Sequence, residues 1–321
     1  MGWEKLENQP AVSKLLQNSL AQGRVAHAYL FSGPDLNGKK VAARLLAQAV
    51  NCDRGRPCGS CPSCNLITAG SHPDVELIEP EGRFLRLHQI KALCHRAGTT
   101  TLVGRTKVYI LQETEKLLPE GANHLLKTLE EPPADTIFIL FVQHKQVLLP
   151  TIVSRCQQID FQPLPPAVIV KRLQAAGCNP ERAHLAAYLA AGDLATAQKW
   201  TEAEAVTRKE QFLQLVRKLP QGKNIPFEAA ECFAESPEYF LPLLQAWYRD
   251  LLVWHAGGRQ EVYHRGQEKA IADQASLYSY RKLVSCNRII DETSRLILGP
   301  HNVNVRLALE ALLVQLIPAA K

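Results

Sequence analysis

The stretch "SGPDLNGKK" contains residues that could bind a phosphate group. Gly33, Gly38 and Lys39 match the phosphate-binding loop G-x-x-x-x-G-K-[ST]. In that loop, glycines let backbone N–H groups wrap the phosphates, and the lysine reaches the β and γ phosphates. The last position should supply a hydroxyl to Mg²⁺, but here it is Lys40, which cannot coordinate a cation. Asp35 also places negative charge close to the expected phosphate position.

A second ATPase element is altered in the same direction. An active site of this type has an apolar strand that ends in Asp-Glu, where the Asp holds Mg²⁺ and the Glu polarises the attacking water. The matching stretch is "KVYILQET", in which Glu113 is retained but Gln112 takes the place of the Asp. A neutral amide is a poor magnesium ligand. Two changes that both remove magnesium ligands predict a loss of ATP hydrolysis.

Four cysteines are suited to binding a metal ion. The segment "CDRGRPCGSCPSC" places Cys52, Cys58, Cys61 and Cys64 at the spacing C-x5-C-x2-C-x2-C. In a reducing compartment, such a cluster more often holds a metal than disulfides. Four thiolates complete a tetrahedral Zn²⁺ site and leave no open position. We therefore predict a structural zinc site, with redox chemistry as the alternative.

The elements that must position these residues are strands and helices in alternation. Four short apolar runs predict strands at 28–31, 75–78, 107–111 and 136–142. Helical patterns lie between them, at 40–50 and 114–129. Runs that are apolar throughout are typical of strands buried on both faces. The first half is therefore predicted to be α/β with a parallel sheet.

The second half of the chain is predicted to be helical. Three prolines in "FQPLPP" (161–166) indicate a boundary, beyond which strand signals nearly vanish. Residues 167–200 are Ala-rich, and a longer helical region begins near residue 205. One helix face there is apolar through Leu244, Trp247, Leu251 and Trp254.

Composition is that of an ordinary globular protein. The 321 residues are 46% hydrophobic and 21% charged, and the formal net charge is +6. This mild excess of positive charge permits contact with nucleic acid without establishing it. No apolar run approaches the ~20 residues that span a bilayer, and the first residues lack the pattern of a signal peptide. We therefore expect a cytoplasmic protein.

Several segments together resemble the bacterial clamp-loader ATPase family. In chain order they are "HAYLFSGP", the cysteine cluster, "AGSHPD", "ANHLLKTLEEPPADTIFIL" and "TIVSRC". Residues 302–316 are also similar to the family's C-terminal helix. The resemblance implies an AAA+ fold in three parts. These are an α/β domain at 1–163 with its zinc module at 52–64, a helical lid at 164–204 and an oligomerising helical collar at 205–321.

The resemblance also gives the altered loop a meaning, because some subunits of this family do not hydrolyse ATP. Two further family positions are changed: the lid arginine falls near Ala195, and the sensor at the end of a strand falls near Gln143. Arg155, in "SRC", is retained. The equivalent arginine projects into a neighbouring subunit's ATP site, where it stabilises charge on the transferred phosphoryl group. Gly33, Gly38 and Lys39 are then a vestigial phosphate loop.

The predicted function is that of a non-hydrolysing clamp-loader subunit of DNA polymerase III. It supplies Arg155 in trans and helps to load a sliding clamp on primed DNA. The implied partners are the ATPase (gamma/tau) subunits, the delta subunit, the clamp, and primer-template DNA in the assembled ring. We expect no intrinsic ATPase activity, while nucleotide binding at Lys39 is left open. The alternatives are an active ATPase motor subunit and a zinc-dependent nucleic-acid-binding module.

Charged residues in the signature helix leave two interpretations open. Lys127, Glu130 and Glu131 are either surface charges before a Pro-Pro stop, or contacts to an adjacent subunit or to DNA. His72, in "SHPD", is predicted to lie in a turn beside the zinc module and outside the metal site.

Overall fold

Five parallel strands organise the first part of the chain. The computed structural model describes residues 2–82, 84–222, 224–299 and 303–318. Its strands lie in the order β2-β3-β4-β1-β5. They are β1 (Ala28–Ser32), β2 (Val75–Ile78), β3 (Lys107–Leu111), β4 (Thr136–Val142) and β5 (Gln157–Asp160). The four predicted strands are present, and β5 was not predicted.

The register of the strands brings their carboxyl ends to one edge of the sheet. Ser32 at the end of β1 pairs with Val142 at the end of β4, and Leu111 of β3 pairs with Leu140. Because all five strands are parallel, the residues that follow them meet at this edge. The phosphate loop, the altered Asp-Glu position and the sensor position therefore lie at the same edge.

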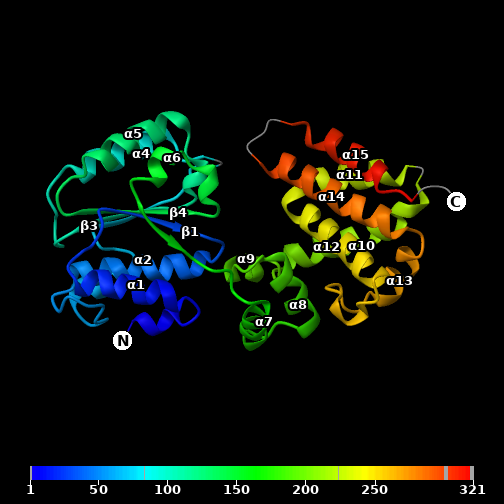
Figure 1. The fold of residues 1–321 in the computed structure, drawn as a ribbon, viewed down its shortest axis with the longest axis horizontal. Coiled ribbons are helices and arrows are strands. Elements are labelled where there is room, and N and C mark those ends of the chain that lie inside the picture. The colour runs from blue at the N-terminus through cyan, green and yellow to red at the C-terminus, as the bar shows by residue number, and fades with distance from the viewer. Residues whose placement is uncertain (1, 83, 223, 300–302, 319–321) are drawn as a thin grey trace. The chain divides into compact units, whose positions relative to one another are not determined.

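Helices cover both faces of the sheet (Figure 1). On one face lie α1 (Pro10–Ala21) and α2 (Leu36–Asn51), and on the other lie α4 (Leu87–Ala97), α5 (Pro119–Glu130) and α6 (Pro150–Val153). Along β1, Tyr29 and Phe31 join the core under α1 and α2, while Leu30 joins the opposite core. This alternation follows from the period of two along a strand. The predicted AAA+ α/β fold is confirmed.

Shorter elements connect these layers. They are α3 (Pro62–Ala69) and the 3-10 turns η1 (Trp3–Leu6), η2 (Thr114–Lys116) and η3 (Lys145–Val147). The stretch predicted as one helix, 114–129, is the turn η2 followed by α5. The break comes at Pro119, which begins α5 and lacks the N–H group that a helix interior requires.

The second part of the chain is helical, as predicted. The chain divides into two compact units, residues 1–164 and 165–321, and the finer division into lid and collar stays a prediction. The first helices of the second unit are α7 (Pro166–Ala175), α8 (Pro180–Leu189), α9 (Leu194–Lys199), α10 (Ala203–Lys218) and η4 (Leu219–Gln221). The others are α11 (Ile225–Glu235), α12 (Pro237–His255), η5 (Arg259–Glu261), α13 (Glu268–Ala275), α14 (Tyr280–Leu298) and α15 (Val305–Gln315).

The apolar face of α12 lies at the centre of this helical unit. Leu244, Trp247 and Leu251 are fully buried, whereas Trp254 is only partly buried. Asp250 on the same helix is also buried, and its carboxylate lies 2.9 Å from Nδ1 of His264. A buried charge needs such partners. None of the described helices combines the length and apolar character needed to cross a membrane.

The motif "SHPD" fixes the loop that precedes β3. The buried carboxylate of Asp74 accepts hydrogen bonds from the backbone N–H groups of Leu102, Val103 and Gly104, at 2.6–2.8 Å. The ring of His72 accepts the N–H of Asp74, at 3.1 Å. His72 therefore lies in a turn, as predicted. Burial alone would raise the pKa of Asp74, but the three N–H groups outweigh it and lower the pKa.

We predict that Asp74→Asn destabilises the protein. Asparagine keeps one acceptor oxygen but cannot accept all three N–H groups, so the loss is about 1–3 kcal/mol. Because the folded state lowers the pKa, the contribution is present above the ordinary aspartate value of 3.8. It is lost as the pH falls through the lower folded-state value.

Thermal unfolding at neutral and acid pH checks this prediction. The gap between wild type and Asp74→Asn should be largest near pH 7 and should close only below about pH 3.8. Asp53→Asn is the matched control, because the Asp53 side chain is 72% exposed. Equal stability of the Asp74 and Asp53 variants at pH 7 would contradict the structural role.

Candidate functional site

The phosphate loop is wound into the first turn of a helix. The helix predicted over 40–50 is present, but α2 begins earlier, at Leu36. The physical reason is Asp35, which caps the helix: its Oδ1 accepts the N–H of Gly38, at 2.9 Å. Its backbone oxygen accepts the N–H of Lys39, at 3.0 Å. N–H groups used in this way are not open to wrap a phosphate.

The carboxylate of Asp35 is also held from outside the loop. Gln9 donates from Nε2 to Asp35 Oδ2 at 2.9 Å and to the backbone oxygen of Gln162 at 2.7 Å. The N–H of Gln162 returns a bond to Gln9 Oε1, at 3.0 Å. Gln9 and Asp35 are each only 3% exposed. A buried anion therefore lies at the helix N-terminus, the position that favours a phosphate in a working loop.

Both loop glycines have close neighbours. Gly33 has a φ of 120°, and a Cβ added there would lie 2.0 Å from the backbone oxygen of Phe161. A Cβ on Gly38 would lie 2.2 Å from Asp35 Oδ2. Gly33 is required by the packing of the loop, because a side chain there would meet backbone. At Gly38 a side chain would have to displace the capping carboxylate of Asp35.

Lys39 points into the protein. Its Nζ donates to the backbone oxygens of Gly33, at 2.6 Å, and of Val142, at 3.0 Å. The residue is 4% exposed. Lys39 also interacts electrostatically with Glu115. Burial raises the pKa of Glu115, and the positive charge of Lys39 opposes that rise. In this arrangement the lysine satisfies buried carbonyls, a structural role.

Gln112 and Glu113 stand at the Asp-Glu position. Gln112 is buried and donates from Nε2 to Glu79 Oε1, at 2.7 Å. Glu113 has a left-handed backbone, with φ of 47°, and its carboxylate pairs with Lys116. An amide that donates to a carboxylate cannot also serve as a metal carboxylate. The chemistry of this edge therefore lacks both magnesium ligands that the sequence analysis found altered.

Gln143 and Ala195 stand at the two remaining family positions. Gln143 follows β4 and is exposed. Ala195 lies at the start of α9, where its N–H bonds Asp193 and its side chain is a methyl group. The side chain of Ala195 therefore offers neither a charge nor a hydrogen-bond donor.

Arg155 lies away from these groups, after α6. Its guanidinium forms an ion pair with Glu130 at the end of α5, with NH2 2.6 Å from Oε1. NH1 donates to the backbone oxygen of Thr151, at 2.9 Å. The Arg155 side chain is 34% exposed. An arginine held at the surface in this way can reach a ligand that another molecule brings.

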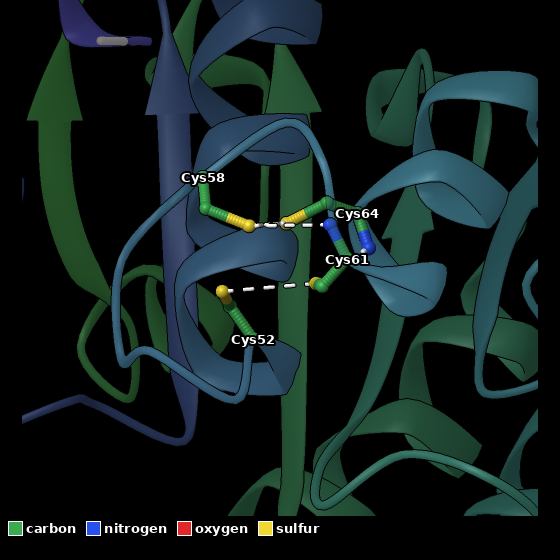
Figure 2. A group of neighbouring side chains, drawn as sticks. All are labelled: Cys52, Cys58, Cys61 and Cys64. Atoms are coloured by element: carbon green, nitrogen blue, oxygen red, sulfur yellow. Dashed lines mark hydrogen bonds between the residues drawn. The ribbon is translucent and has the colours of Figure 1, made fainter.

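The four predicted metal ligands converge at the junction of α2 and α3. Figure 2 shows the four thiols pointing toward one another. The Sγ atoms of Cys58 and Cys64 lie 3.8 Å apart, as do those of Cys52 and Cys61. All four sulfur atoms are within 4.8 Å of one another. A tetrahedron with Zn–S bonds of about 2.3 Å has sulfur atoms about 3.8 Å apart, so the arrangement fits this metal.

Backbone N–H groups support the same cluster. Cys58 Sγ accepts the N–H groups of Ser60 and Cys61, and these bonds lower its pKa to about 5. Cys61 Sγ accepts the N–H of Cys64, at 3.4 Å, whereas burial raises the pKa of Cys64 to about 12. Because a bound cation favours thiolate, a metal would oppose the effect of burial on Cys64. The four cysteines could hold a metal such as zinc.

The structure thus separates the predicted site residues into three places: the loop, the cysteine cluster and the surface at Arg155. Sequence reasoning missed Gln9 and assigned no partner to Arg155. Both contacts join residues far apart in sequence, so no local spacing indicates them. The only local signal was Asp35 itself, a negative charge inside a phosphate loop.

Comparisons with known proteins agree with the fold and the motifs. A family model described as "DNA polymerase III, delta subunit" matches residues 8–165, and one described as "DNA polymerase III, delta subunit, C terminal" matches residues 203–317. DNA polymerase III subunit delta' of Bacillus subtilis (strain 168) is 34% identical over 328 residues, covering 98% of each chain.

Two further proteins are similar to this chain over different shares of its length. DNA polymerase III subunit delta' of Pseudomonas aeruginosa is 33% identical over 306 residues, covering 90% of this chain and 91% of that protein. Subunit tau of Bacillus subtilis is 39% identical over 174 residues, covering 53% of this chain and 31% of that protein. The resemblance to the clamp-loader family is confirmed across nearly the whole length. The chain belongs to the delta' subunits of DNA polymerase III, in the clamp-loader family.

Proposed function

We propose that this chain is a non-hydrolysing clamp-loader subunit that supplies Arg155 to the ATP site of a neighbouring ATPase subunit. The observation that carries the proposal is the contrast between two cations. Lys39 is buried and bonded to one carbonyl of its own loop and one at the end of β4, whereas Arg155 is one-third exposed at the surface. The chain's own site has lost its magnesium ligands, and the group that serves another site is retained.

The partners follow from the family and from this division of roles. This chain is similar to a tau subunit over about half of its own length, and the ATP that Arg155 reaches would be held by such a gamma/tau subunit. In the assembled loader, with a delta subunit, this chain would help to open a sliding clamp and load it on primer-template DNA. An arginine at that position stabilises charge on the transferred phosphoryl group and can contribute ~10³–10⁵ in rate.

The cysteine cluster would hold one structural Zn²⁺ through Cys52, Cys58, Cys61 and Cys64. Four protein ligands leave no open position for substrate, so the metal would contribute stability and no catalysis. It would fix the end of α2 to the start of α3, since Cys52 is the C-cap of α2 and Cys61 the N-cap of α3.

Arg155→Ala is expected to abolish hydrolysis at one ATP site of a reconstituted loader. Single-turnover ATP hydrolysis, with clamp and primed DNA, measures the effect. The fold should be little changed, because an exposed ion pair is worth about 0–1 kcal/mol. Arg96→Ala is the matched control, since Arg96 also pairs with a surface glutamate, Glu76, at 2.6 Å. A loader that hydrolyses ATP equally with either variant would rule out the proposed role.

Lys39→Met is expected to change stability and not nucleotide affinity. The substitution leaves the buried carbonyls of Gly33 and Val142 without this donor, which costs about 1–3 kcal/mol. Chemical denaturation measures the loss, and Lys40→Met is the control because Lys40 is exposed. Calorimetric titration of the wild-type chain with Mg-ATP supplies the opposing test. Micromolar binding with turnover, abolished in Lys39→Met, would establish the active-ATPase alternative instead.

Purified protein is expected to contain about one Zn²⁺ per chain, by elemental analysis. Cys64→Ser should remove the metal and lower the melting temperature, whereas Cys178→Ser, outside the cluster, should do neither. Metal loss should follow acidification, because protons compete with the metal for thiolates. Full metal content in Cys64→Ser would show that this sulfur is not a ligand.

A further inference from the structure

We propose that Glu130 is the residue that positions Arg155 for its role in trans. This inference rests on the proposed function and assigns a second residue to it. Glu130 is the last residue of α5, in the motif "LLKTLEEPP", whose charges the sequence analysis left without a definite role. Its carboxylate contacts the Arg155 guanidinium at 2.6 Å.

The placement of Glu130 favours a specific partner. A carboxylate in the last turn of a helix faces the negative end of the helix dipole, which is unfavourable for an acidic side chain. Lys127, on the preceding turn, is exposed, and Glu130 forms an ion pair with Arg155. An acidic residue at this position is stabilised by the arginine that it holds.

Rigid backbone supports both ends of the pair. Leu129, which precedes Glu130, is 2% exposed, and Ile152 and Cys156, on either side of Arg155, are 1% and 8% exposed. These three side chains belong to the same hydrophobic core, beneath α5 and α6. Because the neighbouring residues are packed, the backbone at Glu130 is held in place, and its carboxylate can orient the guanidinium.

The hydrogen-bond geometry leaves the arginine able to bind phosphate while it stays paired. NH1 donates to Thr151 and NH2 lies against Glu130. Each terminal nitrogen of a guanidinium carries a second N–H group, and Nε carries another. The two contacts therefore fix the plane of the guanidinium. Its other N–H groups can donate to an oxyanion, which the planar arrangement of donors suits well.

Fixing the guanidinium beforehand has a kinetic consequence. A free arginine side chain samples many rotamers, and only those that point at the neighbouring phosphate are productive. Holding it in place should affect the rate of the chemical step more than the affinity for ATP, because the contact matters most where charge develops. Glu130 is thus a positioning residue and does not itself touch the reacting atoms.

The test uses the full reconstituted loader with clamp and primed DNA. The variants are E130A, E130Q, R155A and the double variant E130A/R155A, with E131A as the matched control. Glu131 is the exposed neighbour that follows α5. Single-turnover ATP hydrolysis and its dependence on ATP concentration are measured, and assembly is checked by gel filtration.

We expect E130A to lower the hydrolysis rate on the order of tenfold with KM for ATP unchanged. E130Q, which keeps an acceptor oxygen, should fall between E130A and wild type. The double variant should match R155A, since Glu130 has no role once the arginine is gone. E131A should behave as wild type.

Three other results would count against the inference. If R155A lowers hydrolysis and E130A equals E131A, the positioning role is wrong and the proposed function stands. If R155A leaves hydrolysis unchanged, both are wrong. If the losses of E130A and R155A multiply in the double variant, Glu130 acts independently of Arg155, by contact with DNA or a neighbouring subunit, and the positioning role is overturned.

Discussion

The parallel pairing of β1 between β4 and β5 is the constraint on which the rest of the first unit depends. The pairing fixes Ser32, Val142 and Asp160 near one edge, so whatever follows these strands shares one environment. In a working nucleotide site, that convergence assembles the phosphate loop and magnesium ligands. Here the same convergence joins Gly33 to the strand ends through hydrogen bonds from its N–H to Val142 and Gln143.

Within that framework, one carboxylate occupies the helix N-terminus that favours a phosphate in a working loop. Asp35 places a negative charge at the N-terminus of α2. Gln9, which precedes α1, holds the Asp35 carboxylate there through a hydrogen bond. The buried Nζ of Lys39 is bonded to a loop carbonyl and a strand carbonyl. The Asp35 cap and the Lys39 contacts are compatible with each other. A loop without phosphate needs internal partners for both its N–H groups and its lysine.

The sequence predicted most of the fold because its signals there are local. The runs at 107–111 and 136–142 are buried at every position, and such runs are recognisable without partners. β5 escaped prediction because only Ile159 of its four residues is buried. The cysteine spacing similarly predicted a cluster that lies within thirteen residues of chain. The contacts of Gln9 with Asp35 and of Glu130 with Arg155 span 26 and 25 positions, and only the folded chain brings them together.

The two cations that the motifs singled out show why residue type alone does not assign a function. Lys39 keeps the identity that a phosphate loop requires, yet burial and two carbonyl acceptors commit its donors to the fold. Arg155 has the same charge, but its partners occupy one N–H on each terminal nitrogen and leave it one-third exposed. A buried, satisfied charge stabilises the chain that carries it, and an exposed, oriented one can act on a ligand outside it. The donors that a ligand outside the chain can reach therefore lie at the surface near α5 and α6, where Arg155 pairs with Glu130.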